Sequence, residues 1–329
     1  MSTRLADILS PVRAEVAEFN ARFKGSMLSS VPIVNLIAKY LVRTKGKQVR
    51  PMLVLLAASA CGEITDGTYR AATLVELLHT ATLVHDDVID EADTRRGFAS
   101  IRALWRNKAG VLMGDYLLAK GLLLTVETDE YHFLQITSTA VRRMSEGELY
   151  QLQKARQLNI DEAVYFKIIA DKTASLFATC TELGAASVTD KGTNIAEREM
   201  LRSYGEAVGI AFQIRDDIFD YEESSGIIGK PVGIDLKEKK LTLPLIHSLS
   251  NLEPKEERRI RSLIKTGKAS DSERRLIINL VKATGGLDYA RAKAEEYSGI
   301  AREAITPLPE SAAKKALMDF SHFVIEREK

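Results

Sequence analysis

Two aspartate clusters with the same spacing are the first candidates for chemistry. Both have the form D-D-x-x-D, and they occupy Asp86–Asp90 and Asp216–Asp220. On a helix, residues four apart share a face, so the first and last acids of each cluster point together and repel. A cation is therefore expected between them. Hard oxygen ligands of this kind favour Mg²⁺, which keeps waters and shares phosphate oxygens with a substrate.

A solvated acidic face on a surface helix is the competing interpretation of one such cluster. Two copies, each beside apolar helix and each followed by a basic segment, favour a paired metal site instead. Two clusters facing each other would hold a diphosphate through bridging metal ions.

Basic side chains that suit phosphate oxygens occur near both clusters. Arginine binds phosphate as a planar fork and lysine as a point charge. Taken singly, each of these residues is typical of a solvated surface charge, whereas together they match the needs of two diphosphates. The set consists of Lys47, Arg50, Arg95, Arg96, Lys172, Lys230 and Lys240.

One face of the segment that carries the first cluster combines polar and apolar side chains. At spacings of three, four and four it presents His79, Thr82, Asp86 and Asp90. Before the acids the segment becomes apolar, with Leu74, Val75, Leu78 and Ala81. On this face a histidine is interpreted as a phosphate contact rather than an interior side chain. A metal-binding mouth above an apolar tunnel suits a substrate with a diphosphate head and a hydrocarbon tail.

The elements that must position these residues are predicted to be helices throughout. None of the eight prolines lies between residues 52 and 230, and proline breaks a helix interior at a cost of about 3 kcal/mol. Apolar residues recur there at spacings of three and four. No boundary indicates a second domain, so we expect one all-α domain over residues 1–329. Helices are expected near 12–23, 31–43, 50–61, 68–91, 108–127, 131–153, 161–187, 194–222, 243–250, 256–265, 271–283, 285–305 and 309–327.

Composition indicates an ordinary soluble globular protein. Of the 329 residues, 45% are hydrophobic and 28% charged, and the net charge of +1 excludes a polycation built for nucleic acid. The longest apolar run, Met52–Cys61, is shorter than the ~20 residues of a membrane span. No transmembrane segment is expected, and a cytoplasmic location is predicted. The two cysteines, Cys61 and Cys180, are interpreted as reduced interior side chains.

From about residue 46 to 245 the chain resembles the trans-isoprenyl diphosphate synthases, specifically the medium- and long-chain polyprenyl synthases. The resemblance is carried by motifs that occur in order. They are Gly46–Pro51, His79–Asp90 with Arg95-Arg96-Gly97, Gly114-Asp115, Glu146–Glu148 with Gln151, Lys172-Thr173, Phe212–Asp220, Gly229–Pro231 and Lys240–Pro244.

The resemblance implies a single helical bundle of the isoprenoid synthase type with a central apolar tunnel, and a homodimer. It implies condensation of isopentenyl diphosphate with a geranyl, farnesyl or geranylgeranyl diphosphate primer, with three Mg²⁺ ions per active site. The allylic C–O bond would ionise, the cation would condense with the double bond, and a proton would be lost.

Residue roles are likewise implied by the resemblance. Isopentenyl diphosphate would contact Lys47, Arg50, His79 and Arg96. The allylic diphosphate would contact Arg95, Lys172, Lys230 and Lys240, with Thr173 and Gln213 beside the reacting carbons. Direct Mg²⁺ ligands would be Asp86, Asp90 and Asp216, and Asp87, Asp217 and Asp220 would complete the shells through water. Where the family often has glycine before the last lysine, this chain has Lys239, so either lysine could reach the phosphate.

Product length is predicted from helix rise. Thr82 and Ala81 lie four and five residues before Asp86, roughly 6–8 Å below the metal-binding end. Neither is a bulky aromatic, so the tunnel is expected to admit a product longer than geranylgeranyl. The family resemblance implies the hexaprenyl to octaprenyl or solanesyl range. The candidate tunnel floors are Leu78 and the stretch 122–124.

Three other classes of protein are alternatives to this assignment. A terpene cyclase shares the helical fold and one D-D-x-x-D, but its second metal motif usually mixes Asn, Ser or Thr with Glu. A non-catalytic subunit of a heteromeric synthase usually loses the aspartates, and here all six remain. A carboxylate metal-storage bundle would need inward Glu-x-x-His pairs, which are not found.

Overall fold

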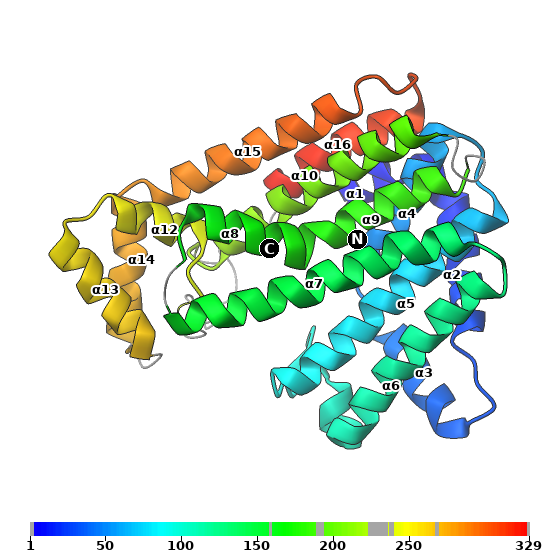
Figure 1. Cartoon of the computed structure of the whole chain (residues 1–329), viewed down its shortest axis with the longest axis horizontal. Coiled ribbons are helices and arrows are strands. Elements are labelled where there is room, and N and C mark those ends of the chain that lie inside the picture. Colours follow the sequence, from blue (N-terminus) through cyan, green and yellow to red (C-terminus); the bar gives the residue numbers. More distant parts are fainter. Residues whose placement is uncertain are drawn as a thin grey trace. The chain divides into compact units, whose positions relative to one another are not determined.

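The computed structural model describes residues 3–157, 160–188, 194–222, 236, 240–266 and 270–327. Apart from a two-stranded hairpin, the regular elements in these ranges are helices, which confirms the all-α prediction (Figure 1). The chain divides into two compact units. The first comprises Met1–Thr139, Thr179–Arg202 and Pro307–Leu317, and the second comprises Ala140–Ala178, Ser203–Thr306 and Met318–Lys329.

The elements run in a simple order along the chain. The first half contains α1 (Thr3–Ile8), a 3-10 turn η1 (Ser10–Val12), α2 (Arg13–Ser26), α3 (Pro32–Arg43), α4 (Val49–Cys61), α5 (Asp66–Ile89), β1 (Thr94–Arg95), β2 (Phe98–Ala99), α6 (Ile101–Val126) and α7 (Tyr131–Gln157). The second half contains α8 (Glu162–Ile169), a π-turn η2 (Ala170–Ala174), α9 (Ser175–Ala186), α10 (Ile195–Phe219), α12 (Leu243–Ser250), α13 (Pro254–Thr266), α14 (Asp271–Ala283), α15 (Gly286–Ala304) and α16 (Ala312–Glu326).

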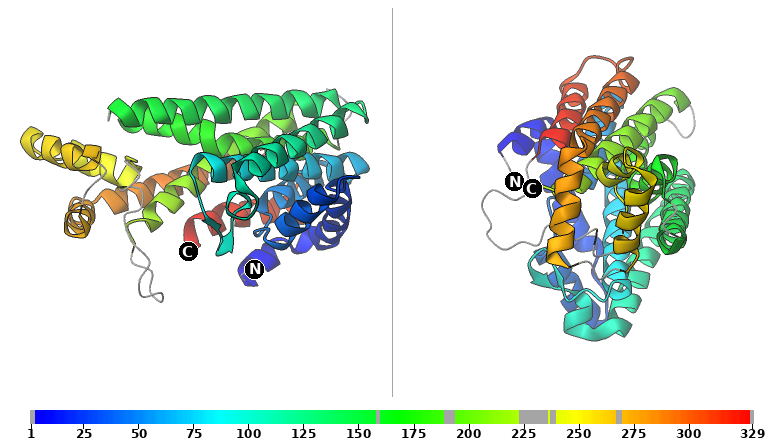
Figure 2. Two further views of the ribbon diagram at one scale, coloured as in Figure 1. Left: turned by 90° about the horizontal axis from the view of Figure 1, so that it is seen from below. Right: turned by 90° about the vertical axis from the view of Figure 1, so that its left-hand side faces the viewer.

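Helix α5 is the central support of the first unit. A capping box starts it, because the Thr65 side chain accepts from the Thr68 backbone N–H and the Thr68 side chain bonds back to Thr65. The helix packs against α4 and, along its length, against α6 (Figures 1 and 2). Its middle is buried on most sides, and Leu74 and Val75 are both 0% exposed. These contacts fix the direction in which α5 carries the first aspartate cluster.

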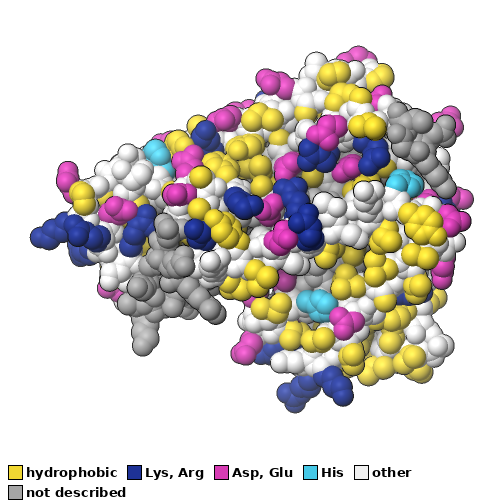
Figure 3. Space-filling model, in the orientation of Figure 1, with side chains coloured by type: hydrophobic (Ala, Val, Ile, Leu, Met, Phe, Trp, Pro, Cys, Tyr) yellow, Lys and Arg dark blue, Asp and Glu magenta, His cyan; other side chains and the backbone are white. Residues whose placement is uncertain are grey.

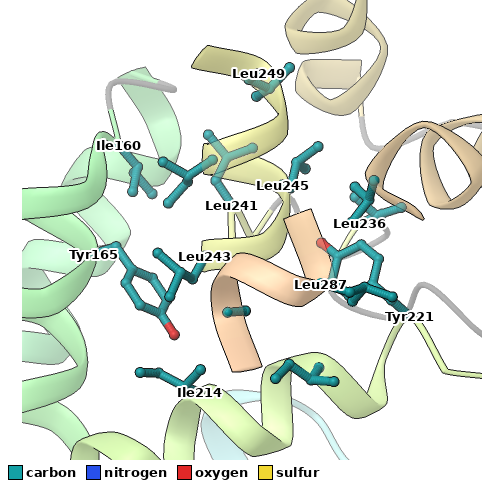
Figure 4. Packing of buried hydrophobic residues seen from close by; sticks show 14 of the residues in the cluster. Ile160, Tyr165, Ile214, Tyr221, Leu236, Leu241, Leu243, Leu245, Leu249 and Leu287 are labelled. Carbon is teal, nitrogen blue, oxygen red and sulfur yellow. The ribbon is translucent and has the colours of Figure 1, made fainter. Parts of the chain in front are cut away.

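A hydrophobic cluster forms the core of the second unit. Side chains from α8, α10, α12, α14 and α15 meet there, and Figure 4 shows Tyr165, Ile214, Leu243 and Leu287 among them. Burying one such side chain contributes about 1.5–3 kcal/mol. Because α10 turns Ile214 and Ile218 into this core, the neighbouring Asp216 is left on the more open side of the helix.

Three local features differ from the predicted helices. Helix α1 precedes the first expected helix, which was predicted to begin near residue 12. Helix α6 begins at Ile101 rather than near 108, and the non-helical Arg106 (φ 71°) interrupts it. The Ser100 hydroxyl accepts from the Ala103 backbone N–H and so caps the early start.

The helix expected over 161–187 is divided into α8, the π-turn η2 and α9. A π-turn contains one more residue than an α-helical turn. The irregular segment expected at 92–100 includes the β1–β2 hairpin, and most of the one expected at 224–240 lies outside the described residues.

Helix α6 exposes much of its apolar surface, seen as hydrophobic side chains at the lower right of Figure 3. The exposed members are Leu104, Val111, Leu112, Leu122, Leu123 and Val126. Of the described helices, it alone is long and apolar enough to cross a bilayer, judged by length and composition. Its most apolar window has mean hydropathy 1.4 and is 33% buried. One helix of this kind is weak evidence for a membrane span, because core helices of soluble proteins have the same properties.

Both cysteines are free in the structure. Cys180 is buried and Cys61 is partly buried. Burial raises the pKa of the Cys61 thiol to about 11 and that of Cys180 to about 12. Both side chains therefore stay protonated near neutral pH, as expected of structural rather than reactive thiols.

Candidate active site

The first aspartate cluster stands at the end of α5. Asp86 and Asp90 are exposed, whereas Asp87 is 3% exposed and accepts a hydrogen bond from Arg95 Nε at 2.6 Å. The Asp90 backbone N–H donates to the Asp86 carbonyl oxygen at 2.8 Å and ends the helix. Carboxylates are disfavoured at this negative end of the helix dipole. Two outward acids here form a site that a cation would stabilise.

The β1–β2 hairpin turns its basic residues back toward the rest of the first unit. The two turn residues, Arg96 and Gly97, have φ of 53° and 80°, as a two-residue hairpin turn requires. Arg96 packs against Gly46 so closely that a Cβ at Gly46 would lie 2.5 Å from the Arg96 Cζ. The missing side chain at Gly46 therefore lets Arg96 approach the segment that carries Lys47, which is exposed.

A histidine and an arginine from separate helices meet in the same unit. Arg50 Nη1 and His79 Nε2 are 2.9 Å apart. Burial lowers the pKa of His79 well below its usual value, and the nearby charges of Arg50, Arg96 and Arg95 lower it further. His79 is therefore neutral near pH 7 and acts as a hydrogen-bonding group. The cluster's positive charge comes from the arginines.

A buried glutamate that was not predicted from the sequence lies one turn before His79 on α5. Glu76 is 6% exposed and accepts a hydrogen bond from Gln48 Nε2 at 3.4 Å. Burial raises the pKa of Glu76, and Arg50, the Gln48 bond, Arg96 and Lys45 oppose the rise. Its position three residues before His79 on α5 was the available signal, because it is the one acid within an otherwise apolar run of that helix.

In the second unit, three predicted residues form one chain of hydrogen bonds. Thr173 Oγ1 donates to Gln213 Oε1 at 2.9 Å, and Gln213 Nε2 donates to Asp217 Oδ1 at 2.8 Å. The hydroxyl of Tyr165 donates to Asp217 Oδ2 at 2.7 Å. Asp217, only 6% exposed, therefore orients the Gln213 amide, and the amide orients Thr173. Tyr165 was not predicted, because its bond depends on tertiary packing of α8 against α10.

The π-turn η2 places Lys172 beside α7. Lys172 forms an ion pair with Glu148 and donates to Gln151 Oε1 at 3.3 Å. Both of these α7 residues belong to the sequence motifs described above. One position earlier, Asp171 accepts from Arg143 Nε at 2.9 Å and from Lys167 at 3.0 Å. Burial alone would raise the pKa of Asp171, but these bonds lower it overall. Turns of this type are frequent at functional sites.

The second aspartate cluster resembles the first in its first two acids and differs in its third, because Asp90 is exposed and Asp220 is buried. The Asp216 side chain is 40% exposed and pairs with Arg327, whereas Asp217 and Asp220 are buried. Lys240 is partly buried. Lys230 and Lys239 lie outside the described residues, so the structure does not place them.

The outward acids have the chemistry that Mg²⁺ prefers. Asp86 and Asp90 supply hard oxygens from one turn of α5, and Asp216 supplies another from α10. Within the described residues, no three His, Cys, Asp or Glu side chains gather closely enough to hold an ion by themselves. Mg²⁺ does not require such a group, because it is commonly held by one or two carboxylates together with waters and substrate phosphates.

The predicted chain-length residues are on the interior side of α5. Ala81 is 0% exposed and Leu78 is 5% exposed. Thr82 is partly buried and donates to the His79 carbonyl oxygen at 2.9 Å, so its hydroxyl is satisfied within the helix. In the other candidate floor on α6, Leu122 and Leu123 are exposed, and residue 124 is partly buried.

Comparison with known proteins gives consistent matches over nearly the whole chain. A family model described as polyprenyl synthetase matches residues 31–281. An all-trans-nonaprenyl-diphosphate synthase (geranyl-diphosphate specific) from Rhodobacter capsulatus is 40% identical over 98% of this chain and 97% of its own length. An octaprenyl diphosphate synthase from Escherichia coli is 35% identical over 96% of each chain.

Solved structures give the same result for the fold. A decaprenyl diphosphate synthase from Rhodobacter capsulatus superposes with a TM-score of 0.90 at 36% identity, covering 99% of both chains. A polyprenyl synthase from Caulobacter crescentus, complexed with calcium and isoprenyl diphosphate, superposes with a TM-score of 0.89 at 34% identity, covering 98% of both chains. The fold type implied by the sequence resemblance is confirmed.

Proposed function

Because the chain belongs to the polyprenyl synthetase family, we propose that it adds isopentenyl units to an allylic diphosphate and releases a medium- or long-chain all-trans polyprenyl diphosphate. The observation that carries the proposal is that the first two acids of each aspartate cluster differ from each other in the same way. Each presents outward acid, at Asp86 and Asp90 or at Asp216, while its second acid is buried and hydrogen-bonded.

We propose that the two clusters face one diphosphate and that Asp86, Asp90 and Asp216 hold Mg²⁺ on it. Three Mg²⁺ ions per site would supply the positive charge that neutralises the leaving diphosphate. The buried acids have a different part. Asp87 holds Arg95, and Asp217 holds Gln213, so each keeps a functional side chain in a fixed position before substrate arrives.

Isopentenyl diphosphate is assigned to Lys47, Arg50, His79 and Arg96. Two observations support this assignment. Arg50 contacts His79, and Arg96 packs over Gly46, the residue before Lys47. A neutral His79 donates one hydrogen bond to a phosphate oxygen without adding charge. The arginines supply the charge, and their shape permits two parallel bonds to one phosphate.

The allylic substrate is assigned to Arg95, Lys172, Lys230 and Lys240, with Thr173 and Gln213 beside the reacting carbons. Lys172 is held by Glu148 and Gln151, so its ammonium is already directed before the diphosphate binds. Thr173 and Gln213 hydrogen-bond to each other, so each side chain helps to fix the orientation of the other. The hydrocarbon tail would run along α5 past Ala81 and Leu78 in a water-free tunnel, and exclusion of water protects the allylic cation.

We further propose that residues 1–329 work as one domain, that the enzyme is a cytoplasmic homodimer, and that the exposed apolar side chains of α6 form its subunit contact. Small side chains at Ala81 and Thr82 support a product longer than geranylgeranyl diphosphate. Geranyl, farnesyl and geranylgeranyl diphosphate are the candidate primers, and the names of the relatives agree with a medium or long product.

The test uses the purified full chain with Mg²⁺, isopentenyl diphosphate and each of the three primers in turn. Diphosphate release and product length are measured with and without isopentenyl diphosphate. The proposal predicts release only when both substrates are present, with products longer than twenty carbons as its chain-length prediction requires. Release from the primer alone would indicate a cyclase, and no release with any primer would indicate a non-catalytic subunit.

A further inference from the structure

The end of α16 makes a direct contact with the second aspartate cluster. Arg327, the residue after the last helical residue Glu326, donates from Nη2 to Asp216 Oδ1. The same nitrogen donates to the backbone oxygen of Phe212 at 3.2 Å. An acid proposed as a metal ligand is therefore already paired with a cation from another helix.

Packing holds the Arg327 side chain in that position. Its guanidinium lies over the ring of Phe212, 3.9 Å from the centroid, and 5.5 Å from the centroid of Phe219. Its Nε donates to the backbone oxygen of Val324 at 3.2 Å, and the side chain is 19% exposed. A guanidinium stacked on two aromatic rings and mostly withdrawn from water occupies a defined place.

The main chain of Arg327 is fastened separately. Arg215 donates from Nε and Nη2 to the Arg327 carbonyl oxygen at 3.3 and 3.2 Å. Arg215 itself lies over Phe219, 4.4 Å from the centroid, and pairs with Glu222 at 3.4 Å. Side chain and backbone of Arg327 are thus both bound to α10 immediately beside Asp216.

We propose that Arg327 is a resident counter-ion of the second aspartate cluster and that a metal-loaded diphosphate displaces it from Asp216. The inference rests on the proposed function, since it takes Asp216 as a metal ligand. Before a metal ion binds, the arginine offsets the repulsion among three neighbouring acids. On metal binding, its positive charge beside a divalent ion becomes unfavourable, so the pairing must weaken.

The two events are linked in both directions. If metal binding weakens the Arg327–Asp216 pair by some factor, then the presence of that pair weakens metal binding by the same factor. Removing the arginine must therefore strengthen metal binding. A purely supporting role for Arg327 predicts the opposite sign, because loss of the support would disorder Asp216 and weaken the metal. The sign of the change therefore separates the two roles.

The experiment measures binding of Mn²⁺, an EPR-visible substitute for Mg²⁺, to the full chain in the presence of inorganic pyrophosphate. Arg327→Gln removes the charge and keeps a hydrogen-bonding side chain, while Arg327→Lys keeps the charge. Arg259→Gln is the matched control, because Arg259 is exposed on α13 and pairs with Glu256 one turn away on the same helix. Asp216→Asn tests the metal ligand itself.

We expect Arg327→Gln to bind Mn²⁺ about tenfold more tightly, because the metal no longer has to break the charged pair between Arg327 and Asp216; tenfold corresponds to about 1.4 kcal/mol. Arg327→Lys and Arg259→Gln should bind as the unchanged protein does. Unchanged or weaker binding by Arg327→Gln would overturn the counter-ion role. If Asp216→Asn leaves Mn²⁺ binding intact, the metal assignment in the proposed function fails instead.

Hydrogen exchange gives a second readout that does not depend on a variant. Amides of residues 318–327 in the unchanged protein should exchange faster when Mn²⁺ and pyrophosphate are added, because the contacts of Arg327 with α10 are lost. Slower or equal exchange in that segment would contradict displacement.

Discussion

Neighbouring aspartates in each cluster share a chemical type and have opposite surroundings. Asp87 and Asp217 are 3% and 6% exposed and accept bonds from Arg95 and Tyr165, whereas the adjacent Asp86 is exposed and the Asp216 side chain is 40% exposed. Removing a partner from a buried acid leaves a costly unsatisfied charge. The buried acids therefore fix local structure, and the outward acids are the ones that solvent reaches.

The neutral His79 gives a prediction about pH and stability. Its pKa is well below the unfolded value of 6.5, so the unfolded chain binds a proton first as the pH falls. Stability is present above that value and is lost below it, by up to about 1.4 kcal/mol per pH unit until the folded group also titrates. A His79→Gln variant should lose less stability than the unchanged protein between about pH 6.5 and pH 5.

Urea unfolding at several pH values checks this prediction. The comparison variant is His247→Gln, because His247 stacks on Tyr289, 4.0 Å between ring centroids, outside the arginine cluster. If His79→Gln and the unchanged protein lose stability in parallel as the pH falls, His79 does not have the low pKa that its burial implies.

Ala81 gives a prediction about product length. It is 0% exposed on α5, and an aromatic side chain there would occupy the path assigned to the hydrocarbon tail. Ala81→Phe should therefore give shorter products, while overpacking costs about 1–3 kcal/mol of stability. Mass analysis of the products measures the chain length directly.

The control for that variant is Ala72→Phe. Ala72 is also 0% exposed, but it lies nine residues earlier, two and a half turns away, on the opposite side of the helix. Equal shortening by both substitutions, or no shortening by Ala81→Phe, would refute the assigned path.

At the scale of elements, the close approach of α7 to the π-turn η2 places Lys172. A Cβ at Gly147 would lie 2.9 Å from the Asp171 Cβ and 3.0 Å from the Lys172 backbone nitrogen. Gly147→Ala should force the two elements apart, reduce stability by about 1–3 kcal/mol and raise the KM for the allylic substrate. Thermal unfolding and steady-state kinetics measure both effects.

Gly299→Ala in α15 is the matched change. Its nearest neighbour would be a flexible Arg302 nitrogen 3.9 Å away, so alanine there should stabilise the helix by up to about 1 kcal/mol. A stable, fully active Gly147→Ala variant would show that the spacing of α7 and η2 is not what positions Lys172.

Some elements could be predicted from the sequence and others could not, for identifiable reasons. The expected helix over 271–283 coincides with α14, where a capping box at Ser270 and Glu273 marks the start. The start of α6 was missed because the positive φ of Arg106 interrupts the helix, so apolar periodicity is regular only beyond it. The π-turn was missed because one extra residue barely changes the spacing of apolar side chains.

The residues of the candidate site likewise divide into those that the sequence predicts and those that it does not. Residues in short motifs, such as His79 and the aspartates, are visible from type and spacing. Glu76, Tyr165 and Arg327 were missed because their roles depend on contacts between helices that are distant in sequence. Of the three, Glu76 alone carried a local signal, as the one acid in its stretch of α5.

At the scale of the whole molecule, a nearly neutral chain still concentrates charge locally. The net charge is +1, yet the acids Asp86 and Asp90 lie on α5 of the first unit, and Lys172 and Asp216 lie in the second. Neither unit alone contains both aspartate clusters. The proposed chemistry therefore requires the two units to act on one diphosphate, and this is the central claim.

Anomalous scattering from crystals grown with Mn²⁺ and an unreactive thio-analogue of the allylic diphosphate tests that claim most directly. The account predicts manganese at about 2.1 Å from carboxylate oxygens of Asp86, Asp90 and Asp216, with all the ions on one diphosphate. Manganese at only one cluster, or two clusters each binding a separate diphosphate, would contradict it.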